Sequence, residues 1–447
     1  MQRRLNVASV GEMARAARAA AQALAAASEA ARNAALEAIA AALESQREHI
    51  LAANALDVEE AGQLVARGEL DEPLLKRLDL SGHKYDATVA MVRSILAQPE
   101  PLGRTQAATE LDEGLVLYRV SVPIGVLGVI FESRPDALVQ IACLCLKSGN
   151  AALLKGGREA ARTNAALAEV MVSATRGMAE MPEHWMALLE GREEVRALLD
   201  EHEHIDLIIP RGSNEFVQYI MNNTNIPVMG HADGICHVYV DRSADIDRAV
   251  DIVVDSKTQY VSVCNAAETL LIHADMAAEA MPRIAEALRA KNVELRLDER
   301  ARQALPADYP SLPASEEDWR TEYLDYILSV RVVDDLAAAV DHINRYGSHH
   351  TDSIVTEDTA AAKAFLNQVD SASVVHNAST RFADGFRYGL GAEVGISTNR
   401  LHSRGPVGLE GLTSYKYVLE GNGHQVASYE GESARAFTHK KLSVHWK

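Results

Sequence analysis

Apolar residues recur every three or four positions over residues 9–66, the spacing that places them on one face of a helix. The segment is rich in Ala, Leu, Glu and Arg, which favour helices. Its apolar residues are mostly Ala and keep no heptad, so a coiled coil is the weaker alternative. We therefore predict long amphipathic helices that pack on the face of a domain, ended by Pro99, Pro101 and Gly103.

Two short strand-like runs, 107–111 and 115–120, flank the turn Asp112-Glu113-Gly114. Glycine suits the positive φ that a tight hairpin turn requires. A hairpin between helical regions has exposed edges, and pairing with another chain would satisfy their backbone groups. We predict that it is a subunit-contact element.

From Pro123 onward strands and helices alternate, which is typical of a parallel sheet with crossover helices. The first stretch, a candidate dinucleotide-binding domain, has expected strands at 124–131, 151–155 and 204–210, and helices at 136–147, 159–174 and from Asn214. A second stretch begins near Asp241, with expected strands at 266–273, 326–333 and 353–356 and helices at 275–291 and 335–346. The fold class is thus α/β, and 447 residues favour at least two domains.

The amino-acid composition argues against several classes of protein. Apolar residues make up 48% and charged residues 24% of the chain, as in soluble globular proteins. The net charge of -19, without a long Lys/Arg run, argues against a nucleic-acid surface. We expect no membrane span and no secretion signal, because no 18-residue apolar run occurs. Four cysteines are too few for a disulfide framework, which favours a reducing, cytoplasmic setting.

The four cysteines differ in their surroundings. Cys143 and Cys145 lie in an apolar helical run, so we expect both to be buried. Cys236 is followed by His237, whose imidazole could lower the pKa of the thiol. Cys264 stands among small and polar residues just before a predicted strand, a context better suited to nucleophilic attack. We favour Cys264 as the reactive thiol and leave Cys236 as the alternative.

Histidines offer a rival, metal-centred interpretation through 201–204 or through His231 with Cys236 and His237. The first cluster is typical of a solvated helix end. The second lacks a C-x-x-C or H-x-x-x-H companion. We therefore expect no metal site.

Neither a G-x-G-x-x-G nor a P-loop motif follows any predicted strand. The turn 210–213 joins a strand to a helix, where backbone N–H groups and the helix dipole could hold a diphosphate; an ordinary helix start is the alternative. Lys155 ends a predicted strand and Arg158 follows, at the sheet edge where open sheets bind ligands. They could neutralise the 2′-phosphate of NADP or be a solvated strand end.

Several motifs in order carry a family resemblance. The chain resembles, nearly end to end, the aldehyde dehydrogenase superfamily, and within it the γ-glutamyl phosphate reductases. The most specific stretches are 123–135 (PIGVLGVIFESRP), 146–150 (LKSGN), 230–237 (GHADGICH), 264–270 (CNAAETL) and 344–351 (NRYGSHHT). Asp136 stands where the resemblance leads us to expect asparagine.

The resemblance implies an aldehyde dehydrogenase-like α/β fold, with an open parallel-sheet cofactor domain, a smaller α/β catalytic domain and a β-hairpin oligomerisation element. The expected boundaries are 1–107, 122–247 and 386–405 for the cofactor domain, 248–385 for the catalytic domain, and 108–121 with 406–447 for oligomerisation.

The resemblance also implies roles for individual residues. Cys264 matches the nucleophile. The implied cofactor-binding residues are Lys155, Arg158, Gly212, Ser213 and Glu322. The implied substrate-binding residues are Ser133, which stands near the usual oxyanion-hole asparagine, Arg134, which could face a phosphate or form a structural ion pair, His231 and Asn265.

The implied reaction is the NADPH-dependent reduction of L-glutamate 5-phosphate to L-glutamate 5-semialdehyde and phosphate in proline biosynthesis, through a thioester on Cys264. His231 falls where hydrolytic relatives place a general-base glutamate, and a reductase needs no activated water. The alternatives are an NAD(P)-dependent dehydrogenase of another small aldehyde and a noncatalytic scaffold. We expect a homo-oligomer, and association with glutamate 5-kinase stays open.

Overall fold

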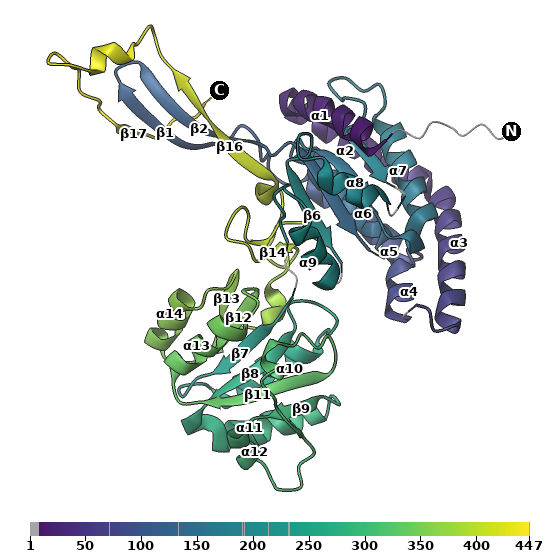
Figure 1. The fold of residues 1–447 in the computed structure, drawn as a ribbon, viewed down its shortest axis with the longest axis vertical. Helices are drawn as coiled ribbons and strands as arrows, with labels where there is room; N and C mark the ends of the chain where they lie inside the picture. The colour runs from purple at the N-terminus through teal and green to yellow at the C-terminus, as the bar shows by residue number, and fades with distance from the viewer. Residues whose placement is uncertain are drawn as a thin grey trace.

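The computed structural model describes residues 9–70, 72–132, 134–189, 191, 193–212, 214–230 and 233–446. It contains two parallel sheets with their helices and an antiparallel arm that projects away from both (Figure 1). The predicted α/β fold class is confirmed. Within the described residues, none of the helices combines the length and the hydrophobicity that crossing a bilayer requires.

The first sheet has the strand order β5-β4-β3-β6, and all its pairings are parallel. Every residue of β3 and β4 is buried, as expected for central strands covered on both faces. Its strands are β3 (Val126–Phe131), β4 (Ala151–Lys155), β5 (Met186–Leu189) and β6 (Leu207–Arg211).

Helices from the amino-terminal part of the chain cover this sheet. The helix α1 packs on β3, β4 and β5, whereas α6 and α7 pack on the sheet beneath an outer layer of α2, α3 and α5. The predicted amino-terminal helices are thus confirmed. The helices are α1 (Val10–Ala26), α2 (Glu29–Ser45), α3 (Arg47–Ala66), α4 (Glu72–Leu78), α5 (His83–Leu96), α6 (Pro135–Lys147), α7 (Ala161–Thr175), α8 (Glu193–Asp200) and α9 (Asn214–Asn222).

The second sheet is also parallel, with the order β10-β9-β11-β8-β7-β12-β13. Alternate residues of β7 enter different clusters: Val238 and Val240 pack with α10 and α11, whereas Tyr239 packs with α13 and α14. Since neighbouring strand residues point to opposite faces, helices cover both sides. The strands are β7 (Cys236–Val240), β8 (Ala267–His273), β9 (Glu294–Leu297), β10 (Leu312–Pro313), β11 (Ile327–Val333), β12 (Thr351–Val355) and β13 (Ser373–His376); the helices are α10 (Ile246–Thr258), α11 (Ala274–Arg289), α12 (Glu299–Gln303), α13 (Leu336–Tyr346) and α14 (Thr359–Gln368).

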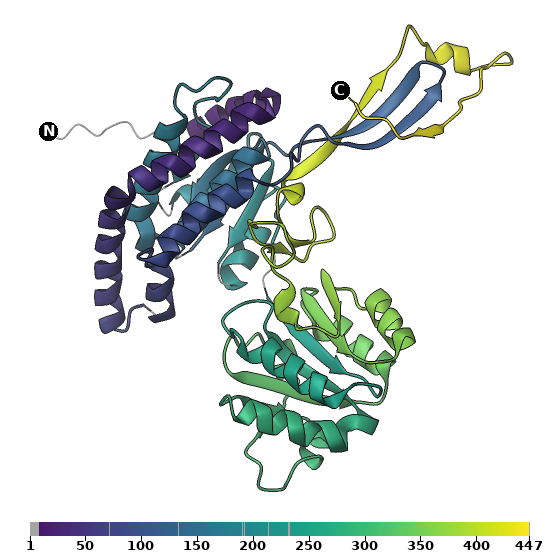
Figure 2. The same ribbon diagram turned by 180° about the vertical axis from the view of Figure 1, so that it is seen from behind.

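The predicted hairpin is confirmed as β1 (Thr105–Asp112) and β2 (Leu115–Pro123). Strands from the end of the chain, β16 (Thr413–Glu420) and β17 (Lys440–Leu442), extend it to the sheet β16-β2-β1-β17 (Figure 2). The expected domain boundaries stay a prediction, with one difference in sheet membership: β7 precedes residue 248 but lies in the second sheet.

Candidate active site around Cys264

A cleft of about 510 Å³ lies where the carboxyl edge of the first sheet meets the loop that precedes β8. Parallel sheets gather ligand-binding residues at this edge because their strands all end there. Three residues singled out from the sequence, Cys264, Gly212 and Glu322, line this cleft together. Their roles stay predictions, but their proximity is a property of the fold.

The Cys264 thiol has a histidine partner. The Nε2 atom of His350 lies 3.1 Å from Sγ of Cys264. His350 is fully buried just before β12, and its Nδ1 lies 2.9 Å from Oγ1 of Thr351. His350 lies inside the family motif 344–351, but no local pattern predicts its pairing with Cys264, because the two residues are 86 positions apart.

The structure does not support Cys236, the alternative candidate, as a reactive thiol, because its side chain is inaccessible to solvent. It is fully buried in β7, where burial raises the pKa of its thiol well above the ordinary value. Its Sγ donates to the carbonyl of Cys264 at 3.2 Å and lies 3.6 Å from Nδ1 of His350. His237 points to the other face of the strand, with Nδ1 2.8 Å from Oδ1 of Asp352. Strand alternation therefore separates the two neighbours that the sequence suggested as a pair.

The remaining cysteines are buried, as predicted. Cys143 and Cys145 lie inside α6 with no exposed surface. Burial raises the pKa of both thiols, that of Cys145 to about 12. All four cysteines are free, and of these thiols only that of Cys264 is partly exposed.

Closely packed backbone fixes the loop that carries Cys264. A Cβ atom on Gly234 would lie 2.2 Å from the carbonyl oxygen of Cys264, so only glycine permits this approach. Nearby, Lys257 and Glu268 form a fully buried ion pair at 2.6 Å. Burial lowers the pKa of Lys257 and raises that of Glu268 to about 7, and the attraction between the two charges opposes both shifts.

Two of the predicted cofactor residues, Lys155 and Gly212, lie at the carboxyl edge of the first sheet. Ile130 pairs with Lys155 and Phe131 with Arg211, so the ends of β4, β3 and β6 are in register. The Lys155 side chain is buried, and its Nζ donates to the carbonyl of Gly156 at 2.5 Å.

Two further predicted residues flank this edge. Arg158 is exposed at the start of η1 (Arg158–Ala160). Among the described residues that line the cleft, neither Lys155 nor Arg158 occurs. Glu322 does, and its Oε2 accepts a hydrogen bond from Nδ2 of Asn214 at 3.1 Å, which links α9 to the second sheet. Ser213 lies outside the described residues.

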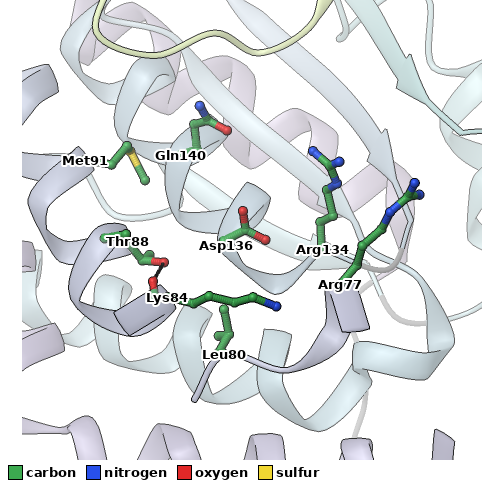
Figure 3. A pocket seen from close by; sticks show the side chains of 9 residues that line it. Arg77, Leu80, Lys84, Thr88, Met91, Arg134, Asp136 and Gln140 are labelled. Carbon is green, nitrogen blue, oxygen red and sulfur yellow. Dashed lines mark hydrogen bonds between the residues drawn. The ribbon is translucent and has the colours of Figure 1, made fainter. Parts of the chain in front are cut away.

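Arg134 and Asn265, the predicted substrate-binding residues that the structure describes, lie in different surroundings. Arg134 precedes α6 and lines a second cavity of about 320 Å³ (Figure 3). Asn265 is buried, and its Nδ2 donates to the carbonyl of Ala383 at 2.9 Å, so its amide faces the interior. Ser133 and His231 lie outside the described residues.

Positive charge gathers beside Cys264. Arg77 lines both cavities, and its Nη2 donates to the carbonyl of Ser262 at 3.4 Å. Burial, and after it the neighbouring charge of Arg134, lower the pKa of Arg211. Such a cluster favours an anion and stabilises a thiolate. No role was predicted for Arg77, and Arg211 stood only within the predicted turn 210–213, because an isolated arginine carries no local sequence signal.

The part of the chain that the structure describes holds no group of three or more His, Cys, Asp or Glu side chains arranged to bind a metal ion.

Comparisons with known proteins agree with this geometry. The model of the aldehyde dehydrogenase family matches residues 2–304. The chain is 54% identical to the gamma-glutamyl phosphate reductase of Natronomonas pharaonis, over 96% of this chain and 97% of the relative. It is 54% identical to the enzyme of the same name from Acetivibrio thermocellus, over 97% and 99%.

A solved structure extends the agreement to three dimensions. The crystal structure of gamma-glutamyl phosphate reductase from Thermotoga maritima matches with a TM-score of 0.89 and 39% identity, covering 94% of this chain and 100% of that one. This chain belongs to the aldehyde dehydrogenase family, among the γ-glutamyl phosphate reductases.

Proposed function

We propose that this chain reduces L-glutamate 5-phosphate to L-glutamate 5-semialdehyde and phosphate, a step of proline biosynthesis, with Cys264 as the nucleophile and NADPH as the reductant. The names of its relatives support the substrate. The observation that carries the chemistry is the Cys264 thiol in an open cleft, 3.1 Å from a buried imidazole nitrogen.

His350 activates the thiol in this proposal. Its Nε2 accepts the proton of Cys264, and the resulting imidazolium stabilises the adjacent thiolate. The contact of Nδ1 with Thr351 holds the ring in this orientation.

The thiolate then attacks the acyl carbon of the substrate. The bond between that carbon and the phosphate oxygen breaks, a thioester forms on Cys264, and phosphate leaves with the bonding electrons. Arg77 and Arg134, which line the neighbouring cavity, and Arg211 in the cleft stabilise the leaving anion, since a guanidinium can bind two phosphate oxygens at once.

The residues of the cleft fit a nicotinamide dinucleotide. Gly212 precedes α9, whose first N–H groups suit a diphosphate. Glu322 is oriented by Asn214 to accept from a ribose hydroxyl, and Lys155 and Arg158 would hold the 2′-phosphate that distinguishes NADPH. When bound, this cofactor supplies a hydride to the thioester carbon. The resulting thiohemiacetal collapses to the aldehyde and frees Cys264.

The arm carries the proposed subunit contact. Along β16, Tyr415, Tyr417 and Leu419 alternate on one face and are about half exposed. A row of apolar side chains on a projecting sheet suits burial against a second copy of this chain. A cytoplasmic location, in keeping with four free cysteines, and association with glutamate 5-kinase stay predictions.

The test runs the reaction backwards. Purified protein with L-glutamate 5-semialdehyde and NADP⁺ should form NADPH only when phosphate is present. Cys264→Ala should abolish turnover while NADPH still quenches the protein fluorescence. Phosphate-independent oxidation of other small aldehydes with NAD⁺ would favour the alternative dehydrogenase, and unchanged turnover by Cys264→Ala would exclude the thioester mechanism.

A further inference from the structure

The second cavity lies between α5 and α6, next to the cleft of Cys264. Its lining is chemically mixed: Arg77, Lys84 and Arg134 are cationic, Asp136 is anionic, Gln140 is an amide, and Leu80 and Met91 are apolar (Figure 3). Arg77 lines both this cavity and the cleft, so the two spaces adjoin at that side chain.

Arg134, Asp136 and Gln140 are partly exposed and line this cavity, and the charges of Arg134 and Asp136 act on the nearby Arg211. The structure records no ion pair or hydrogen bond between the side chains of Arg134, Asp136 or Gln140 and any other described residue, although all three line the same space. The Nε atom of Arg77 is a buried donor without a hydrogen-bond partner among the described residues. Because polar groups of both signs line one cavity and keep free hydrogen-bonding capacity, the cavity can accept a ligand that carries both charges.

We infer that this cavity binds the amino-acid end of the substrate, with Asp136 pairing with the α-ammonium group and Lys84 with the α-carboxylate. The inference rests on the proposed function, because it assigns the part of L-glutamate 5-phosphate that does not react. The acyl carbon stays at Cys264, and the two methylene groups that follow lie along Leu80 and Met91.

Hydrogen bonds to the backbone hold the ammonium group of Lys84 in place. Its Nζ donates to the carbonyl of Lys76 and, at 3.0 Å, to that of Asp79. An ammonium group has three N–H donors, so one remains for a ligand. Both carbonyls belong to the end of α4 or the residue after it, and these two hydrogen bonds fix the Lys84 side chain beside the cavity before substrate binds.

The charged residues of the cavity match different ends of the substrate. Asp136 repels phosphate, so a cavity built only for the leaving anion would gain nothing from this carboxylate. Arg77 and Arg134 serve the acyl phosphate near Cys264, whereas Asp136 and Lys84 match a zwitterion. The cavity therefore selects an α-amino acid over a simple aldehyde or acyl phosphate.

Three aldehydes test the assignment in the phosphate-dependent reverse assay: L-glutamate 5-semialdehyde, 5-oxopentanoate, which lacks the amino group, and pentanal, which lacks both ionic groups. We expect kcat/KM of the unmodified protein to fall about tenfold or more at each step, since a charge-assisted hydrogen bond contributes about 1.5–3 kcal/mol. This comparison needs no variant.

Variants of Asp136 and Lys84 test which residue binds the α-ammonium group and which binds the α-carboxylate. Asp136→Ala should lower kcat/KM for L-glutamate 5-semialdehyde about tenfold or more, with a much smaller loss on 5-oxopentanoate. Asp136→Asn keeps an oxygen acceptor and should restore part of the loss. Lys84→Met should lower kcat/KM for both carboxylate-bearing aldehydes more than for pentanal. Asp86→Asn, on the exposed side of α5, is the control for an equal change of charge.

Two outcomes overturn the inference: equal use of L-glutamate 5-semialdehyde and 5-oxopentanoate by the unmodified protein, or an equal loss on both with Asp136→Ala. Failure of the proposed function looks different, because the unmodified protein would then form no NADPH from any of the three aldehydes in the presence of phosphate.

Discussion

The imidazole of His350 and the thiol of Cys264 meet across two loops, with Nε2 3.1 Å from Sγ. Cys264 precedes β8 and His350 precedes β12, and both strands belong to the second sheet. The same edge of the second sheet therefore positions this thiol and this imidazole.

Replacement of His350 by Asn should lower kcat by about 10²–10⁴-fold, the usual contribution of a positioned general base. Alkylation of Cys264 should also slow, because its thiol then lacks the neighbouring imidazole nitrogen that accepts its proton. Stopped-flow assays and alkylation rates across pH measure both effects. His349→Asn is the matched control, since the Nδ1 of His349 faces the carbonyl of Asp370 instead. Equal effects of the two variants would remove the special role of His350.

Alkylation should discriminate among the four cysteines. Iodoacetamide should modify Cys264 in the folded protein and leave Cys143, Cys145 and Cys236 unmodified, because these three are fully buried and burial raises the pKa of each thiol. Peptide mapping by mass spectrometry before and after denaturation checks this. Modification of Cys236 as fast as Cys264 in the folded state would contradict the structure.

The buried pair of Lys257 and Glu268 should be costly to break. Glu268→Gln leaves the Lys257 ammonium buried without its counter-charge, and we expect a loss of about 3–5 kcal/mol in the free energy of unfolding. The double variant Lys257→Met with Glu268→Gln should be less destabilised. Urea unfolding compares them with Glu357→Gln, which breaks the exposed pair with Arg248 and should cost about 1 kcal/mol or less.

Asp318 should contribute to acid sensitivity. Burial raises the pKa of this carboxyl, but hydrogen bonds from Ser315 and the ion pair with Arg296 outweigh burial and hold the pKa well below its usual range. A carboxyl with a lowered folded-state pKa stabilises the fold above its unfolded pKa of about 3.9, and this stability is lost as pH falls.

The free energy of unfolding should therefore drop more steeply below about pH 4 in the unmodified protein than in Asp318→Asn. Urea unfolding over a series of acidic buffers measures the two slopes. The exposed residue Asp308 provides the control variant Asp308→Asn, whose slope should match that of the unmodified protein. Parallel slopes for all three proteins would contradict the assignment.

The arm should control assembly. Tyr417→Lys combined with Leu419→Lys places two charges on the exposed apolar face of β16 and should lower the molar mass in light scattering, without loss of secondary structure. Leu56→Lys, which replaces an exposed leucine on α3, should leave the mass unchanged. An unaltered mass in the arm variant would place the subunit contact elsewhere.

The sequence by itself determined the features that depend on local patterns. Continuous apolar runs predicted β4 with its bounds and β3 to within two residues at its start, because a strand covered on both faces has no polar position. The small, polar surroundings of Cys264 also distinguished it from the cysteines of α6. The alternation of strands and helices predicted the α/β fold class, and the family motifs then implied its aldehyde dehydrogenase-like form.

Only the tertiary structure decided which side chains meet. The short strands β5, β7 and β13 went unpredicted because a run of four or five residues is too short to show a strand period in the sequence. Cys236 and His237 are adjacent in sequence, yet strand alternation turns them apart. Cys264 and His350 are remote in sequence, yet parallel pairing within one sheet brings them together, and no local pattern encodes such a contact.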